Sequence, residues 1–298
     1  MEMWFSEFHT PDVKHSIRVN RQLYSKQSDY QRIDIFETPE FGRVLTLDGN
    51  VMLTERDEFI YDEMITHVPM SVHKEAKDIL VIGAGDGGVV RELTRYDRVR
   101  HIDLVEMDPM VVEACRAYLP GNACRLDDRR VHLHYENALK FIRRCEGKYD
   151  LIIVDSSDPF GPSEGLFTRE FYGNCYNALK DGGLLMFDVF KPAEKIIQKQ
   201  MYQEASRFRD ANRNVYIVTV SHRISQCNHL HTCLYDYRKW PNIKDEGISI
   251  KITYKYLYMV EVEQLLTQIG FCNIGVKEIF DGHINLVTAY KLPKNIND

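Results

Sequence analysis

The middle of the chain, from residue 78 to residue 190, alternates between short apolar runs and amphipathic segments. The apolar runs have the length of buried strands and lie at 79–82, 101–106, 131–135, 151–154 and 184–189. Helical segments are predicted between them, at 88–95, 109–118, 138–145 and 168–179. Strands that alternate with helices predict a parallel sheet covered on both faces, because right-handed crossovers place the helices there. The pattern therefore predicts a doubly wound, Rossmann-like α/β sheet, which binds ligands at the carboxyl ends of its strands.

The N-terminal part follows a different pattern. Between residues 14 and 54, short runs typical of β-strands are separated by turn residues, and Asp48-Gly49 is a hairpin signal. A helix is predicted at 58–67, where apolar residues recur on one side. We therefore expect two domains: a small antiparallel β-hairpin domain at 1–57 and a Rossmann-like catalytic domain at 58–298.

Composition narrows the classes of partner. The chain has 298 residues, of which 44% are hydrophobic and 28% charged, as in ordinary globular proteins. A net charge of −6 and the lack of a dense Lys/Arg run argue against nucleic acid as a partner. The first 14 residues do not resemble a targeting peptide, and no apolar run approaches the roughly 18 residues that span a bilayer. Seven cysteines without a C-x-x-C pair indicate reduced thiols, so we expect a cytoplasmic protein.

The loop after the first strand of the predicted sheet is rich in glycine, Gly83-Ala84-Gly85-Asp86-Gly87-Gly88. It satisfies G-x-G-x-x-G, and Glu106 ends the next strand where a ribose-binding acid belongs. Dinucleotide binding is therefore an alternative, as is a tight turn that binds nothing. Asp86 argues against a pyrophosphate, because its carboxylate would repel phosphate and attract an amine or a sulfonium.

Glu106 can accept hydrogen bonds from both hydroxyls of a ribose. Its alternative interpretation is a solvated acid at a strand end. For Asp103 and Asp108, on either side of Glu106 in the sequence, the solvated acid is the interpretation we adopt.

The loop after the strand at 151–154 carries two carboxylates three residues apart, Asp155 and Asp158. Two prolines and two glycines within 155–167 predict a defined loop over the pocket. The carboxylates can flank a cationic diamine, and one of them can act as the base that frees an amine lone pair. Alternatively, both cap the following turn.

Taken together, Gly-x-Gly-Asp-Gly-Gly, Glu106-Met107-Asp108 and Asp-Ser-Ser-Asp-Pro-x-Gly-Pro resemble the spermidine synthase family. Tyr30-Gln31, Leu47-Asp48-Gly49 and the segment 54–64 are similar to its hairpin domain and domain junction. The resemblance extends from about residue 4 to about residue 185. It implies a class I methyltransferase-type fold and an enzyme that transfers an aminopropyl group from decarboxylated S-adenosylmethionine to putrescine, giving spermidine and methylthioadenosine.

The resemblance also implies roles for individual residues. It assigns nucleoside binding to Gln31, Gly83, Gly85, Asp86, Glu106 and Asn137. Within that set, Asp86 would bind the propylamine and Glu106 the ribose. Asp155, assisted by Tyr61, would take a proton from putrescine, and Asp158 would hold an end of the diamine. Decarboxylated S-adenosylmethionine is a co-substrate, neither metal nor prosthetic group is implied, and a homodimer or homotetramer is expected.

The sequence departs from the family pattern in two places. Asn137 stands where the family usually has an Asp that meets the adenine amino group, so it keeps an acceptor oxygen and loses the charge. From Met186 onward the chain lacks the usual Gln-containing strand end and the later Tyr-Pro-Ser-Gly segment. Its last part, a helix at 259–269 and strands at 275–280 and 285–290, resembles a class I methyltransferase ending and would complete the same sheet.

Two alternatives follow from this divergent end: an S-adenosylmethionine-dependent methyltransferase, or a catalytically silent nucleoside-binding scaffold. A zinc site at Cys227, His229, His231 and Cys233 is also conceivable. On a strand these side chains share one face, but residues two apart lie roughly 6.6 Å apart, too far for all four to reach one ion. A loop could bring all four to one ion, but we favour a half-buried strand or loop and predict no metal site there.

Overall fold

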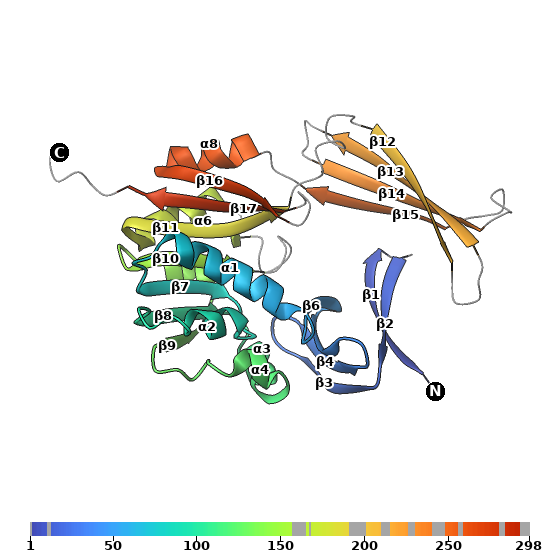
Figure 1. The fold of residues 1–298 in the computed structure, drawn as a ribbon, viewed down its shortest axis with the longest axis horizontal. Coiled ribbons are helices and arrows are strands. Elements are labelled where there is room, and N and C mark those ends of the chain that lie inside the picture. The colour runs from blue at the N-terminus through green and yellow to red at the C-terminus, as the bar shows by residue number, and fades with distance from the viewer. Residues whose placement is uncertain are drawn as a thin grey trace.

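The structure is a computed structural model of the chain. It describes residues 2–10, 13–156, 165–166, 168–190, 201–209, 215–225, 230–239, 248–255, 259–279 and 284–292. These residues form a two-stranded, a seven-stranded and two four-stranded sheets (Figure 1).

The seven-stranded sheet is the centre of the fold. Its strands are β7 (Asp78–Gly83), β8 (His101–Glu106), β9 (Val131–Tyr135), β10 (Tyr149–Asp155), β11 (Leu179–Phe190), β16 (Phe271–Ile279) and β17 (Ile284–Lys291). They are ordered β16-β17-β11-β10-β7-β8-β9, with β7 to β11 parallel and β17 antiparallel to both neighbours. The expected doubly wound sheet is confirmed, and the last strand pair completes it. The strand order reverses between β7 and β10, where such folds bind ligands.

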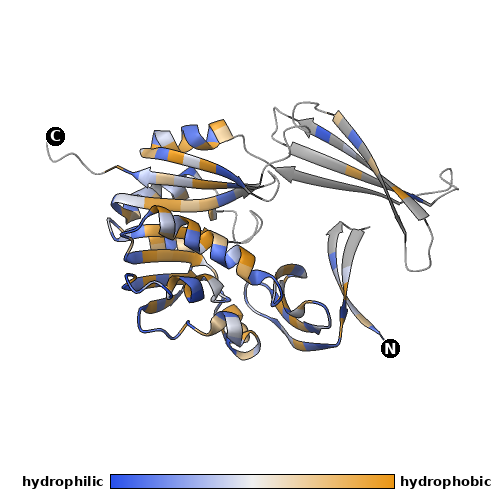
Figure 2. Cartoon of the chain, viewed as in Figure 1, coloured by the Kyte–Doolittle hydropathy of each residue, from blue (hydrophilic) through white to orange (hydrophobic). Residues whose placement is uncertain are grey.

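Apolar residues in consecutive positions of each central strand pack into two hydrophobic cores, one on each face of the sheet. In β7, Ile79 and Val81 pack with helices α1 (Glu58–Val72), α2 (Gly88–Leu93) and α3 (Pro109–Tyr118), whereas Leu80 and Ile82 face the opposite side. That side holds α5 (Ala138–Ile142), α6 (Arg169–Ala178) and α8 (Met259–Ile269). Figure 2 shows the resulting hydrophobic strands in the centre of the sheet. Side chains alternate between the faces of a strand, so a continuous apolar run is required where both faces are covered.

Helix α1 is longer than predicted. The expected helix ended at residue 67, two residues before Pro69, yet the structure continues it to Val72 with Pro69 inside. Proline removes one helical hydrogen bond. Pro69 and Met70 are buried, so packing holds this last turn in place.

The N-terminal residues form two small antiparallel sheets. One is the hairpin of β1 (Met3–Thr10) and β2 (Val13–Val19). The other has the order β3 (Arg21–Gln27), β4 (Arg32–Thr38), β5 (Gly42–Leu47) and β6 (Asn50–Thr54). Asp48 and Gly49 have φ values of 50° and 80°, the left-handed conformations of a tight hairpin turn. The expected antiparallel domain and its Asp-Gly turn are confirmed.

A further four-stranded antiparallel sheet was not predicted from the sequence. It consists of β12 (Met201–Arg209), β13 (Val215–Ser225), β14 (Leu230–Lys239) and β15 (Ile248–Lys255), paired in chain order. It lies beside the N-terminal hairpin, where β15 contacts β1 (Figure 1).

Candidate active site

A cavity of about 820 Å³ opens at the carboxyl ends of β7, β8 and β10 and continues along helix α1 and the N-terminal sheet. Every described residue that the sequence assigned to the site lines it: Gln31, Tyr61, Gly83, Gly85, Asp86, Glu106, Asn137 and Asp155. Asp158 lies outside the described residues. The structure thus brings residues from six segments of the chain to one place.

The lining of this cavity has one sign of charge. Nine of its residues are acidic: Glu7, Asp48, Asp57, Glu58, Asp62, Asp86, Glu106, Glu136 and Asp155. Lysine, arginine and histidine are absent from the lining formed by the described part of the chain. Carboxylates gathered in a partly enclosed space attract cations and repel phosphate. The cavity therefore suits ligands that carry several positive charges.

The glycine-rich turn brings neighbouring strand ends together. A Cβ atom on Gly83, whose φ is +83°, would lie 1.8 Å from the backbone oxygen of Asp155. A Cβ on Gly85 would lie 2.8 Å from Oε2 of Glu106. Only glycine fits at position 83, where the clash is with backbone and φ is positive, whereas a side chain at position 85 would displace the carboxylate of Glu106. The glycines therefore set the spacing between the turn and the two acids that face it.

Asp86 is fixed inside this turn. Its Oδ1 accepts hydrogen bonds from the Gly88 backbone N–H at 2.9 Å and from the Asn122 side-chain amide at 3.3 Å. Burial raises the pKa of Asp86, and these two donors act in the opposite direction. Asn122, in helix α4 (Pro120–Ala123), was not singled out from the sequence because nothing local distinguishes a polar residue at that point.

Glu106 is held at the end of β8. The backbone N–H of Asp108 donates a hydrogen bond to its Oε1 at 2.8 Å. Burial raises the pKa of Glu106 to about 7, although this hydrogen bond lowers it. A bound cation nearby would favour the ionised form, which accepts hydrogen bonds from ribose hydroxyls.

Asp155 ends β10 beside Tyr61 of helix α1, which donates a hydrogen bond to it. Burial and the negative charge of Asp86 raise the pKa of Asp155 to about 8, and the hydrogen bond from Tyr61 lowers it. Burial and the charge of Asp155 hold the pKa of Tyr61 well above its usual value. Tyr61 therefore stays a hydrogen-bond donor, and Asp155 has the pKa of a general base that works near neutral pH.

Asp62 is an acid at the cavity that the sequence did not indicate. Its carboxylate lies against the start of helix α2, where a Cβ on Gly88 would be 1.9 Å from Oδ2. Burial and a hydrogen bond with Glu58 raise the pKa of Asp62 to about 10. Glu58 in turn accepts hydrogen bonds of 3.0 and 2.9 Å from Arg91. The sequence could have indicated Asp62, because it directly follows Tyr61. Two neighbouring residues on one helix can both reach a cavity at its side.

Two predicted nucleoside contacts are already hydrogen-bonded to the protein. The side-chain oxygen of Asn137 accepts from the backbone N–H groups of Leu139 and Lys140, at 2.9 and 3.3 Å, and so caps helix α5. Only the remaining hydrogen-bonding capacity of the amide is available to a nucleoside. The Gln31 amide nitrogen donates to Oδ2 of Asp108 at 3.1 Å.

The interpretation of Asp103 and Asp108 as solvated acids was wrong, because both are 1% exposed. Asp103 accepts hydrogen bonds from Lys148 and Tyr149, each at 2.6 Å, and lies 2.7 Å from the His134 ring. Their hydrogen bonds hold the pKa of Asp103 below its usual value despite burial. Alternation along β8 did not reveal these partners, which come from β9, from β10 and from the residue before β10.

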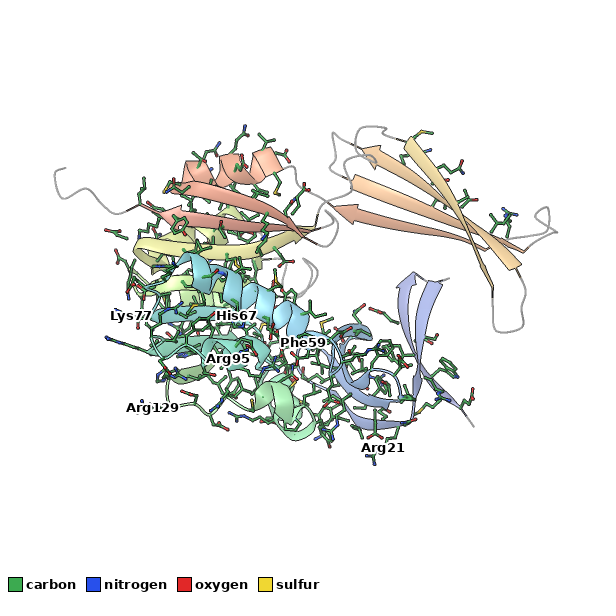
Figure 3. All side chains as sticks on the ribbon, viewed as in Figure 1. Arg21, Phe59, His67, Lys77, Arg95 and Arg129 are labelled. Atoms are coloured by element: carbon green, nitrogen blue, oxygen red, sulfur yellow. The ribbon has the colours of Figure 1, made fainter. Side chains whose placement is uncertain are left out.

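The described residues contain one group of three side chains close enough to hold a metal ion, Glu63, His67 and Glu92. It lies between helices α1 and α2, where Figure 3 labels His67 and Arg95. Glu92 already pairs with Arg91 at 2.9 Å and with Arg95 at 2.5 Å. These arginines compensate its charge, so we interpret the cluster as an ion-pair network. In the other candidate segment, Cys227 and His229 lie outside the described residues.

Comparison with known proteins agrees with a cavity that suits cationic ligands. Residues 58–230 match the spermine/spermidine synthase domain, and residues 3–55 match the spermidine synthase tetramerisation domain. The chain belongs to the spermine/spermidine synthase family. The polyamine aminopropyltransferase of Clostridium perfringens (strain SM101 / Type A) is 62% identical over 210 residues, covering 70% of this chain and 74% of that protein. The one from Alkaliphilus oremlandii is 56% identical, with the same coverage.

Solved structures of the spermine/spermidine synthase family share the fold. A spermidine synthase in complex with the transition-state analogue AdoDATO has a TM-score of 0.68 and 30% identity, covering 99% of this chain and 82% of that one. Spermidine synthase from Thermotoga maritima has a TM-score of 0.66 and 29% identity, with 99% and 81% covered. The expected family, fold and class of enzyme, an aminopropyltransferase, are confirmed. The match to the tetramerisation domain supports a homo-oligomer.

In the part of the chain that the structure describes, no helix has both the length and the apolar character needed to cross a membrane.

Proposed function

We propose that this member of the family transfers the aminopropyl group of decarboxylated S-adenosylmethionine to putrescine, and that Asp155 is the base. The observation that carries the proposal is the cavity lined by nine acidic residues, with no basic residue among those described there. Both proposed substrates are cations: one carries a sulfonium and an ammonium, the other two ammonium groups. Such ligands gain Coulomb energy at every ionised carboxylate they approach.

The nucleoside would lie along the carboxyl ends of β7 and β8. Gly83 and Gly85 leave room for it, and Glu106 would accept hydrogen bonds from its ribose. Gln31 and Asn137 line the same part of the cavity. Asp86, held by backbone and Asn122 donors, would face the propylamine.

Asp155 would remove a proton from one ammonium of putrescine. In the ligand-free protein its pKa of about 8 leaves much of it protonated at neutral pH. Binding of the sulfonium and ammonium charges beside it would lower that pKa, so the base becomes ionised when the substrates are in place. Asp158, outside the described residues, would hold an end of the diamine.

The neutral amine then attacks the carbon next to the sulfonium. The C–N bond forms as the C–S bond breaks, the sulfur keeps the electron pair, and methylthioadenosine leaves. The proton taken by Asp155 is released to solvent, which balances the charge of the trivalent product. The electrophile is already activated by its positive sulfur, so the protein contributes mainly orientation and the ionised base.

The proposal is tested by incubating the purified full chain with decarboxylated S-adenosylmethionine and putrescine and following methylthioadenosine. Stoichiometric methylthioadenosine and spermidine are expected. Intact S-adenosylmethionine with putrescine serves as the control and should give neither product. Absence of product at high enzyme concentration would favour a silent nucleoside-binding scaffold, and methyl transfer would favour a methyltransferase.

Three further expectations remain part of the proposal. The division into domains at 1–57 and 58–298 is supported by the positions of β6, which ends at Thr54, and α1, which begins at Glu58. The homo-oligomer would be a dimer or tetramer that forms through the N-terminal sheets. A cytoplasmic location stays a prediction from the cysteine content.

A further inference from the structure

A buried carboxylate outside the cavity lining connects the N-terminal sheet to the nucleoside end of the site. Asp108 is 1% exposed and lies in the turn between β8 and α3. Its Oδ1 accepts from the backbone N–H of Met110 at 3.0 Å, which caps helix α3. Its Oδ2 accepts from the Ser28 hydroxyl at 2.6 Å and from the Gln31 amide at 3.1 Å. One oxygen therefore caps helix α3, and the other accepts hydrogen bonds from the turn between β3 and β4.

The contact with Gln31 determines which end of that side chain meets a ligand. A carboxylate only accepts hydrogen bonds, so the Gln31 amide has to turn its nitrogen toward Asp108. The carbonyl oxygen, at the other end of the planar amide, is left for the cavity that Gln31 lines. A rotation of the amide by 180° would reverse this polarity.

We infer that Asp108 is a positioning residue for aminopropyl transfer: it fixes the Gln31 amide so that an acceptor oxygen faces a hydroxyl or amino donor of the nucleoside. The same residue's backbone N–H also holds Glu106 at 2.8 Å. Asp108 thus orders two nucleoside-facing groups without touching the ligand. The inference rests on the proposed function, because it takes the ligand to be a nucleoside.

Asp108→Asn separates the two roles of the side chain. Its oxygen can still cap helix α3, but an NH₂ group replaces Oδ2 opposite both Gln31 and the Ser28 hydroxyl. Two donors would then face each other, and rotation of the Gln31 amide relieves this by turning its NH₂ toward the ligand. We expect the Kd for methylthioadenosine, measured by calorimetry, to rise about tenfold. The KM for the nucleoside should rise similarly, while kcat changes less than about twofold. Asp127→Asn, which removes an exposed charge that does not line the cavity, is the matched control and should bind as wild type.

A double-mutant cycle with Gln31→Ala distinguishes positioning from a general structural effect. If Asp108 acts through Gln31, Asp108→Asn should weaken binding no further once Gln31 is absent, and the double variant should match Gln31→Ala. If the two substitutions acted independently and each raised the Kd about tenfold, the double variant would have a Kd about a hundredfold above that of wild type.

The inference is overturned if Asp108→Asn binds methylthioadenosine as wild type does, or if the two substitutions act independently. Failure of the wild-type protein itself to bind methylthioadenosine would instead overturn the proposed function, on which this inference rests. Melting temperatures of all variants identify a loss of binding caused by unfolding. If Asp108→Asn unfolds, Asp108→Ser provides the same test, since a serine hydroxyl can still cap α3 but offers no carboxylate oxygen to the Gln31 amide.

Discussion

The hydroxyl of Tyr61, on helix α1, donates a hydrogen bond to the carboxylate of Asp155 at the end of strand β10. The two residues are far apart in the sequence and belong to different layers of the fold. The hydrogen bond stabilises the ionised carboxylate, while burial and the charge of Asp86 favour the protonated one. Asp155 therefore has a pKa set by opposing effects, which can be changed separately by substitution.

The pH dependence of turnover should report this balance. Asp155 must be ionised to accept a proton, so kcat/KM should rise with pH through about 8, the pKa in the free enzyme. Tyr61→Phe removes the stabilising donor and should move the rising limb to higher pH. Both enzymes are assayed with the same diamine, so titration of the substrate contributes equally. Coincident profiles would mean that Tyr61 does not influence the base.

Asp155→Asn should abolish turnover and leave nucleoside binding nearly unchanged. The amide has a similar shape but cannot take a proton, and loss of a general base typically costs about 100- to 10,000-fold in rate. Turnover is followed by methylthioadenosine release, and binding by calorimetry with methylthioadenosine. An equal loss of both would show that Asp155 is needed for structure.

Asp86 should distinguish decarboxylated from intact S-adenosylmethionine. Intact S-adenosylmethionine carries a carboxylate, which the carboxylate of Asp86 repels. The wild-type protein should bind the decarboxylated form more tightly. Asp86→Asn should reduce the ratio of the two Kd values by about tenfold or more. The amide oxygen can still accept from Gly88 and Asn122. Methylthioadenosine, which lacks the propylamine, is the control; an equal weakening of all three ligands would contradict the prediction.

Asp62 should make the ligand-free protein less stable as the pH rises. Its folded-state pKa, about 10, lies above the unfolded value of about 4, so the folded state holds a proton that the unfolded state releases. The resulting stabilisation is complete below about pH 4 and is lost as the pH rises toward 10. Asp62→Asn is uncharged and should escape this loss, so its stability relative to wild type should grow by up to about 1.4 kcal/mol for each pH unit between pH 5 and 9.

Thermal melts of wild type and Asp62→Asn between pH 5 and 9 check this prediction, and the two curves should diverge as the pH rises. Glu63→Gln, an adjacent and more exposed acid on the same helix, should run parallel to wild type. Parallel curves for Asp62→Asn would contradict the assignment of a buried, protonated acid.

Local sequence determined the strands of the central sheet, the order of strand and helix within it, and most of the candidate site. Apolar runs in β7, β8 and β10 specify a sheet buried on both faces, because side chains alternate along each strand. Topology then predicts that the strands' carboxyl ends meet. Asp86, Glu106 and Asp155 could be selected together because each directly follows or ends such a strand.

Tertiary structure alone decided which of the other acids are buried and which residues each one contacts. Asp62, Asp103 and Asp108 are ordinary acids in the sequence, yet the fold buries all three with partners from distant segments. Burial and pairing set the pKa and the available hydrogen bonds of a carboxylate, and both depend on neighbours that only folding supplies. The sequence could thus name the acids at the ends of its strands, whereas the protonation of Asp62 and the link from Asp108 to Gln31 exist only in the folded chain.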